Sequence, residues 1–116
     1  MKQDPLAITL LYDYYGALLS EKQQLCFDLY YNQDYSLAEI AEEVGISRQG
    51  VHDSITRAET ALREMEEKTG FIAREQRLQA SLAEISRTAE ALLDNEDETV
   101  KQLAEKIRDA ALTIKE

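Results

Sequence analysis

Apolar residues recur every three or four positions along most of this chain, and that spacing is typical of amphipathic helices. The pattern is clearest between residues 36 and 68, where it predicts two helices separated by a break at Gly45. The apolar faces consist of Ile40, Ala41 and Val44 in the first helix and of Val51, Ile55, Ala58 and Leu62 in the second. Each helix therefore has one side to bury and a polar side left for solvent or a partner.

The residues around these two helices are typical of helix ends. Ser36 and Glu39 have the spacing of a capping box, in which each side chain bonds the backbone N–H of the other. Gly45 stands where the chain must leave the first helix in a left-handed conformation, and Ser47 can cap the second helix. Two short helices joined in this way predict a helix-turn-helix, the motif that places its second helix in the major groove of DNA.

Four further helices are predicted, two on each side of the motif. Asp4 followed by Pro5 starts the first, in which apolar residues from Leu6 to Leu18 form a stripe, and Ser20 caps the second. After a stop at Gly70, apolar positions follow in heptad spacing, at residues 71, 78, 82, 85, 89 and 92. A last amphipathic helix follows an acidic break, with Asn95 and Glu98 as its expected cap.

The chain is therefore expected to be all-α, with two domains. Residues 1–70 form a helix-turn-helix domain of four helices, and residues 71–116 form an extension of two amphipathic helices. Two helices are too few to enclose a core alone, so the extension must pack on the first domain or on a second copy. We expect a homodimer, because two-fold dimers are the commonest small assembly, and a hairpin that stabilises the monomer is the alternative.

The net charge changes this picture. Thirteen Lys and Arg stand against 23 Asp and Glu, which gives −10 and repels nucleic acid at long range. The second helix of the motif is locally more favourable, since residues 47–63 contain Arg48, Arg57 and Arg63 against Asp53 and Glu59. DNA binding is therefore expected to be weak, or to depend on a dimer or a partner.

The candidate nucleic-acid-binding residues lie opposite the apolar stripe of that second helix. They are Arg48, Gln49, His52, Asp53, Thr56 and Arg57. Glutamine can bond adenine with both ends of its amide, and arginine can bond guanine or phosphate. Asp53 opposes the approach of phosphate, and Thr56 fits plain surface. A solvated or protein-binding face is the alternative interpretation.

Other kinds of site have little support in the sequence. One Cys and one His exclude metal sites of the zinc-finger type, and no glycine-rich phosphate loop is present. We therefore expect no catalysis, cofactor or metal. The tyrosines could form a base-stacking platform, but their helical spacing favours packing. Without an apolar run of about 20 residues or a signal peptide, and with a lone Cys26, the expected location is the cytoplasm, with no insertion in a membrane.

Part of the chain is similar to known bacterial proteins. Residues 18–59, LLSEKQQLCFDLYYNQDYSLAEIAEEVGISRQGVHDSITRAE, resemble region four of sigma factors. With YDYYGALLSEKQQ at residues 12–24, the likeness is closer to the YlxM family of small cytoplasmic proteins, over about residues 11–68. The resemblance implies a sigma-like DNA-binding fold and a regulatory part in the signal recognition particle pathway. Gly50 and His52 depart from it, since the family pattern has alanine and tyrosine there.

Two hypotheses follow. In the first, the protein is a non-enzymatic regulator that binds DNA as a homodimer. In the second, the same fold is an interaction module that docks on the protein or RNA of the signal recognition particle without sequence-specific DNA binding. The acidic net charge favours the second, because a basic partner is attracted rather than repelled.

Overall fold

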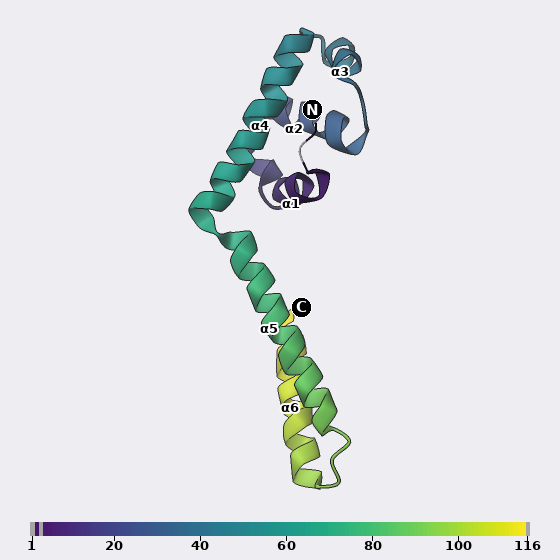
Figure 1. Cartoon of the computed structure of the whole chain (residues 1–116), viewed down its shortest axis with the longest axis vertical. Helices are drawn as coiled ribbons and strands as arrows, with labels where there is room; N and C mark the ends of the chain where they lie inside the picture. The colour runs from purple at the N-terminus through teal and green to yellow at the C-terminus, as the bar shows by residue number, and fades with distance from the viewer. Residues whose placement is uncertain (1, 3, 116) are drawn as a thin grey trace. The chain divides into compact units, whose positions relative to one another are not determined.

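The chain folds into α-helices, and the part that the structure describes, residue 2 and residues 4–115, contains no strand (Figure 1). This computed structural model has six α-helices over those residues: α1 Pro5–Tyr15, α2 Glu21–Phe27, α3 Leu37–Val44, α4 Arg48–Thr69, α5 Phe71–Leu92 and α6 Glu98–Lys115. A 3-10 turn, Gly16–Leu18, follows α1, and a π-helical turn, Asp28–Asn32, extends α2. The predicted all-α fold is confirmed.

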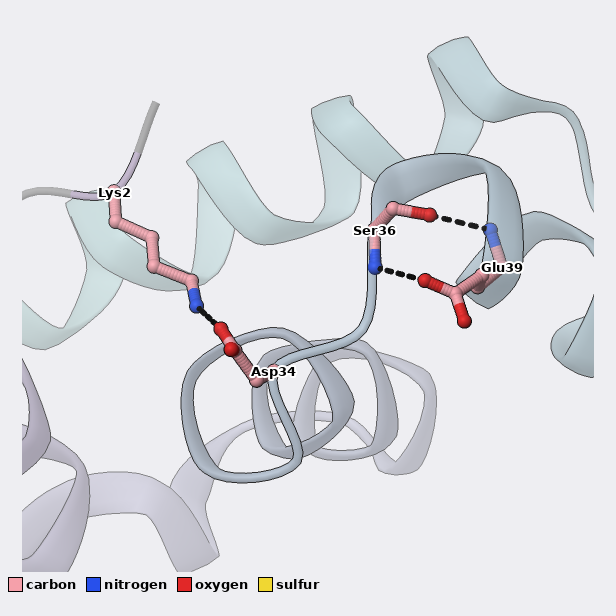
Figure 2. Close-up of polar contacts among 4 residues, drawn as sticks. All are labelled: Lys2, Asp34, Ser36 and Glu39. Carbon is pink, nitrogen blue, oxygen red and sulfur yellow. Dashed lines mark hydrogen bonds and ion pairs between the residues drawn. The ribbon is translucent and has the colours of Figure 1, made fainter.

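Most helix starts follow the caps expected from the sequence. Asp4 accepts a hydrogen bond from the backbone N–H of Leu6 at 3.2 Å, and Ser20 and Gln23 form a complete capping box. Ser36 and Glu39 form the second box, with bonds of 3.0 and 3.1 Å that Figure 2 shows at the start of α3. Ser47 accepts from the N–H of Gly50 at 2.9 Å and so caps α4.

Two helices end at a glycine in the left-handed conformation. Gly45 ends α3 at φ 79°, and Gly70 ends α4 at φ 60°. Only glycine adopts this conformation at low cost, so both positions stop a helix by backbone geometry.

The cap of α6 differs from the expected one. Asp97, rather than Asn95, accepts from the second amide of the helix, the N–H of Thr99, at 2.9 Å. Asn95 instead accepts from the N–H of Asp97 at 2.9 Å and forms the turn before the helix. The prediction was wrong because two capping residues two positions apart compete, and the one nearer the helix is the cap.

The chain divides into two compact units, Met1–Gly70 and Phe71–Glu116. In the first, α4 lies against α1, α2 and α3 (Figure 1). The core behind the helix-turn-helix consists of Cys26, Leu29, Ile40, Val51 and Ile55, all buried. This core fixes the side of α4 that faces inward.

Aromatic packing joins α1 and α2. The ring of Phe27 is fully buried, with the ring of Tyr12 stacked at 4.3 Å between centroids and that of Tyr31 at 4.5 Å. Most tyrosines thus pack against the core as expected, whereas Tyr14 is 43% exposed. The stripe predicted for α1 is wrong at its ends, since Leu6 is 83% exposed and Leu18 71% exposed, whereas Ile8 is buried.

In the second unit, α5 and α6 pack side by side and run in opposite directions (Figure 1). The buried residues of this hairpin are Ile72, Leu82, Ser86, Ala89, Ala104 and Ala111. Most of them are small, so the two helices bury little of their larger side chains against each other.

Candidate nucleic-acid interface

The start of α4 presents a polar face opposite its buried side. Val51, Ile55, Ala58 and Leu62 are buried, and they hold the helix on the core. All six candidate residues, Arg48, Gln49, His52, Asp53, Thr56 and Arg57, are exposed. The structure therefore brings them together on one open side of the first three turns of α4.

Asp53 lies at the centre of this face. Its Oδ1 accepts a hydrogen bond from the Nε2 of Gln49 at 3.0 Å, and the Nδ1 of His52 lies 3.7 Å from the same oxygen. Asp53 therefore orients the amide of Gln49 one turn before it. It also places a negative charge among the residues that would approach DNA.

A polar groove of about 310 Å³ runs between the start of α2 and this part of α4. Its walls are Ser20, Lys22 and Gln23 on one side and Gly50, Asp53, Ser54 and Arg57 on the other. Lys22 and Arg57 give it two cationic side chains, which are the groups that bind phosphate. The groove thus adds Lys22 to the candidate residues.

Sequence reasoning missed Lys22 because it lies far from the motif in the chain. A signal was nevertheless present. Lys22 stands in the first turn of α2, where the partial positive charge of the helix N-terminus disfavours a cation. A basic residue at such a position is a candidate for contact with an anion.

The other edge of this face has only a small hollow of about 20 Å³. It is lined by Tyr30, Leu37, His52, Ile55, Thr56 and Glu59, so two of the candidate residues border it. The side chain of Glu59 is 5% exposed and accepts a hydrogen bond from the hydroxyl of Tyr31. Its carboxylate is therefore withdrawn from the exposed face, leaving Asp53 as the acidic group among the candidates.

Two carboxylates hold the segment before α3. The Nζ of Lys2 lies 2.5 Å from Asp34 Oδ1, and this hydrogen bond and charge lower the pKa of Asp34 (Figure 2). Hydrogen bonds from Ser36, the backbone one first, lower the pKa of Glu39. Both carboxylates therefore stabilise this segment in their charged forms.

The described residues contain neither a metal-binding cluster nor a membrane-spanning helix. No group of three or more His, Cys, Asp or Glu side chains among the described residues is arranged to hold a metal ion. Within the same residues, none of the helices has the length and apolar character needed to cross a membrane.

The paired helices, their caps and the polar face of α4 define a helix-turn-helix protein. A family model described as "Putative helix-turn-helix protein, YlxM / p13 like" matches residues 2–107, and this chain belongs to that family. The resemblance to the YlxM family seen in the sequence is thus confirmed. The family is one of helix-turn-helix proteins rather than of enzymes.

Similar proteins occur in several bacteria. The UPF0122 protein of Thermoanaerobacter sp. (strain X514) is 45% identical over 108 residues, which are 92% of each chain. That of Symbiobacterium thermophilum is 52% identical over 65% of this chain and 70% of its own. That of Halalkalibacterium halodurans is 38% identical over 84% of this chain and 89% of its own. The similarity therefore extends beyond the helix-turn-helix.

Proposed function

We propose that this protein is a non-enzymatic, cytoplasmic regulator that binds duplex DNA as a homodimer through the first three turns of α4. The observation that carries the proposal is the exposed polar face of α4, held by a buried apolar side in a helix-turn-helix. This motif docks its second helix in the major groove, with the N-terminal residues of that helix nearest the bases.

The side chains divide into two roles. Gln49, in the first turn and already oriented by Asp53, is suited to reading a base edge, and Arg48 beside it can bond guanine or phosphate. Arg57 and Lys22, on opposite walls of the same groove, are suited to a phosphate of the DNA backbone. His52 and Thr56 complete the face.

The net charge of −10 supports the homodimer. A single unit offers Arg48, Arg57 and Lys22 to DNA while the rest of the chain repels it. A second copy doubles the short-range contacts on one DNA molecule, and linked binding raises affinity without any new kind of contact.

Fluorescence anisotropy with labelled duplexes from the protein's own gene region and with random duplexes tests this proposal. We expect tighter binding to one of the gene-region duplexes, and affinity that falls with salt. The proposal fails if all duplexes bind equally or none binds at low salt.

Three variants separate the roles. Gln49→Ala should reduce the preference between duplexes, whereas Arg57→Ala should lower affinity for every sequence and reduce the slope of log K against log salt by about 1. Arg63→Ala is the matched control, because it removes the same charge from α4 outside the groove. If Arg57→Ala and Arg63→Ala lower the affinity for DNA equally, the loss comes from the change in net charge and not from the groove.

A second candidate function is docking on the protein or RNA of the signal recognition particle, and the acidic charge favours docking on its protein. A basic protein surface would be attracted by a charge of −10. Pull-down with the purified particle protein, its RNA and duplex DNA in parallel separates the two functions. If the particle protein or its RNA is retained and DNA is not, the second function is supported in place of DNA binding. If neither the particle protein nor its RNA is retained, the second function is ruled out.

A further inference from the structure

The α5–α6 hairpin buries mostly small residues and exposes most of its large apolar ones. Besides Ile72 and Leu82, its buried residues are Ser86, Ala89, Ala104 and Ala111. The larger apolar side chains remain at the surface, with Leu78 44% exposed, Ile85 43% and Ile107 46%. The hairpin by itself therefore leaves much of its apolar surface in water, a condition that favours association.

The exposed apolar residues of α5, called the strip below, lie in one row along the helix. Phe71, Leu78, Ile85 and Leu92 recur at every seventh position of α5, which places them along one side of the helix. Beside Ile85 and Leu92, a groove of about 340 Å³ lies between the helices, with Ile107 of α6 on its other wall. Ser81 and Thr88 also line this groove, and their small side chains leave room for those of another helix.

We propose that the hairpin of a second copy of this chain occupies this groove, with the two α5 helices antiparallel about a two-fold axis near Ser81. The inference rests on the homodimer of the proposed function and identifies the surface through which it forms. In a two-fold dimer each contact occurs twice, so a self-complementary surface is required.

The charges beside the strip have this self-complementarity. Arg77 and Glu84 each stand one residue before a member of the strip, so they lie on the same flank of α5. Antiparallel packing that places Leu78 against Ile85 of the partner subunit brings Arg77 within reach of the partner's Glu84, and the reverse pair forms by symmetry. Within the described residues, neither side chain forms an ion pair in the single chain.

The charge of the whole hairpin also favours antiparallel packing. Residues 82–103, around the turn, contain six acidic and two basic residues, which gives −4. The remaining parts, 71–81 and 104–116, contain four acidic and five basic residues, which gives +1. Antiparallel packing separates the two acidic ends, whereas parallel packing would place them side by side.

Charge exchange tests the arrangement, with mass measured by light scattering across a range of protein concentrations at low salt. The wild-type chain should have twice its 13.2 kDa mass. Arg77→Glu and Glu84→Arg should each place like charges together twice and raise the dimer Kd about tenfold or more. An equimolar mixture of these two variants should form heterodimers, and the double variant should regain the wild-type Kd. Arg87→Glu, the same change off the strip, should leave Kd unaltered.

A monomeric wild-type chain would overturn the proposal, as would single variants that dimerise like the wild type or fail to pair on mixing. A dimer that is insensitive to both charge changes would place the interface elsewhere, and binding of a different protein by a monomer would give the groove another occupant. Since mass is measured without DNA, a dimer that binds no DNA refutes the proposed function and leaves this inference standing.

Discussion

Replacing Gly45 by alanine is expected to destabilise the α1–α4 unit relative to the same replacement at Gly50. Gly45 has φ 79° and ψ 32°, and a Cβ built there would meet no atom of the described residues within 4 Å. The cost is therefore one of backbone conformation alone. A residue other than glycine pays about 1–2 kcal/mol for the left-handed conformation.

Gly50→Ala provides a matched comparison. Gly50 lies in the first turn of α4 without a positive φ, and a Cβ there would lie 3.1 Å from the Oγ of Ser47. Alanine should stabilise this helical position by about 0.5–1 kcal/mol, less any cost of moving Ser47. Both substitutions restrict the unfolded chain equally, so this effect cancels when the two variants are compared. The free energy of unfolding of Gly45→Ala should therefore be lower than that of Gly50→Ala by the left-handed cost, about 1–2 kcal/mol.

Urea unfolding followed by tyrosine fluorescence provides the assay. All six tyrosines lie at or before Tyr35 and the chain has no tryptophan, so the signal reports the α1–α4 unit. The midpoints are compared at equal m-value. Coinciding midpoints for the two variants would refute the reasoning, because they would show that Gly45 carries no left-handed cost.

Three further results are expected. Ser47→Ala removes the acceptor of the Gly50 N–H and should cost about 1 kcal/mol in the same urea assay, and an unchanged midpoint would contradict the cap. The lowered pKa of Glu39 means that its contribution is present above its ordinary pKa of 4.5 and is lost as pH falls through the folded-state value. Glu39→Gln should therefore flatten the acid side of a stability–pH curve, and an identical curve would oppose this. Asp53→Asn removes a carboxylate from the face proposed to bind DNA. If that carboxylate repels phosphate by about 1 kcal/mol, its loss should raise the affinity for all duplexes about fivefold in the anisotropy assay. An unchanged affinity would mean that no phosphate comes close to Asp53.

The helix-turn-helix could be predicted from the sequence because its signals are local. Ser36 with Glu39, the glycine at 45 and the cap at Ser47 each act within a few residues, so their spacing determines their geometry. The exposed face of α4 then followed from its periodicity, since one side of the helix had to be buried.

Features that depend on contacts between distant segments could not be predicted in this way. Leu6 and Leu18 fit the apolar stripe predicted from Leu6 to Leu18, yet both are exposed, whereas Ile8, which lies outside that stripe, is buried in the unit where α1 contacts α4. Lys22 joins the candidate site because α2 packs beside α4. Its position in the first turn of α2 indicates contact with an anion, but no pattern in α2 indicates that α4 is its neighbour.

The hairpin shows the same limit in another form. Heptad spacing predicted that the helix from Phe71 pairs with another helix, but α5 has two overlapping apolar sets. Leu82 and Ala89 pack in the hairpin, whereas Leu78 and Ile85 stay exposed. Periodicity identifies both sets, and only the position of α6 shows which one is left for a partner.

The acidic charge and the proposed docking of α4 on DNA are compatible because they act over different distances. At about 0.1 M salt, exposed charges are screened beyond about 10 Å, so the net charge mainly slows the approach of DNA. At contact distance, Lys22, Arg48 and Arg57 outnumber Asp53, while Glu59 is buried. The proposed affinity for DNA must therefore come from short-range contacts that slow dissociation. A second copy of the chain would double those contacts. It would therefore increase the affinity for DNA without any gain in long-range attraction.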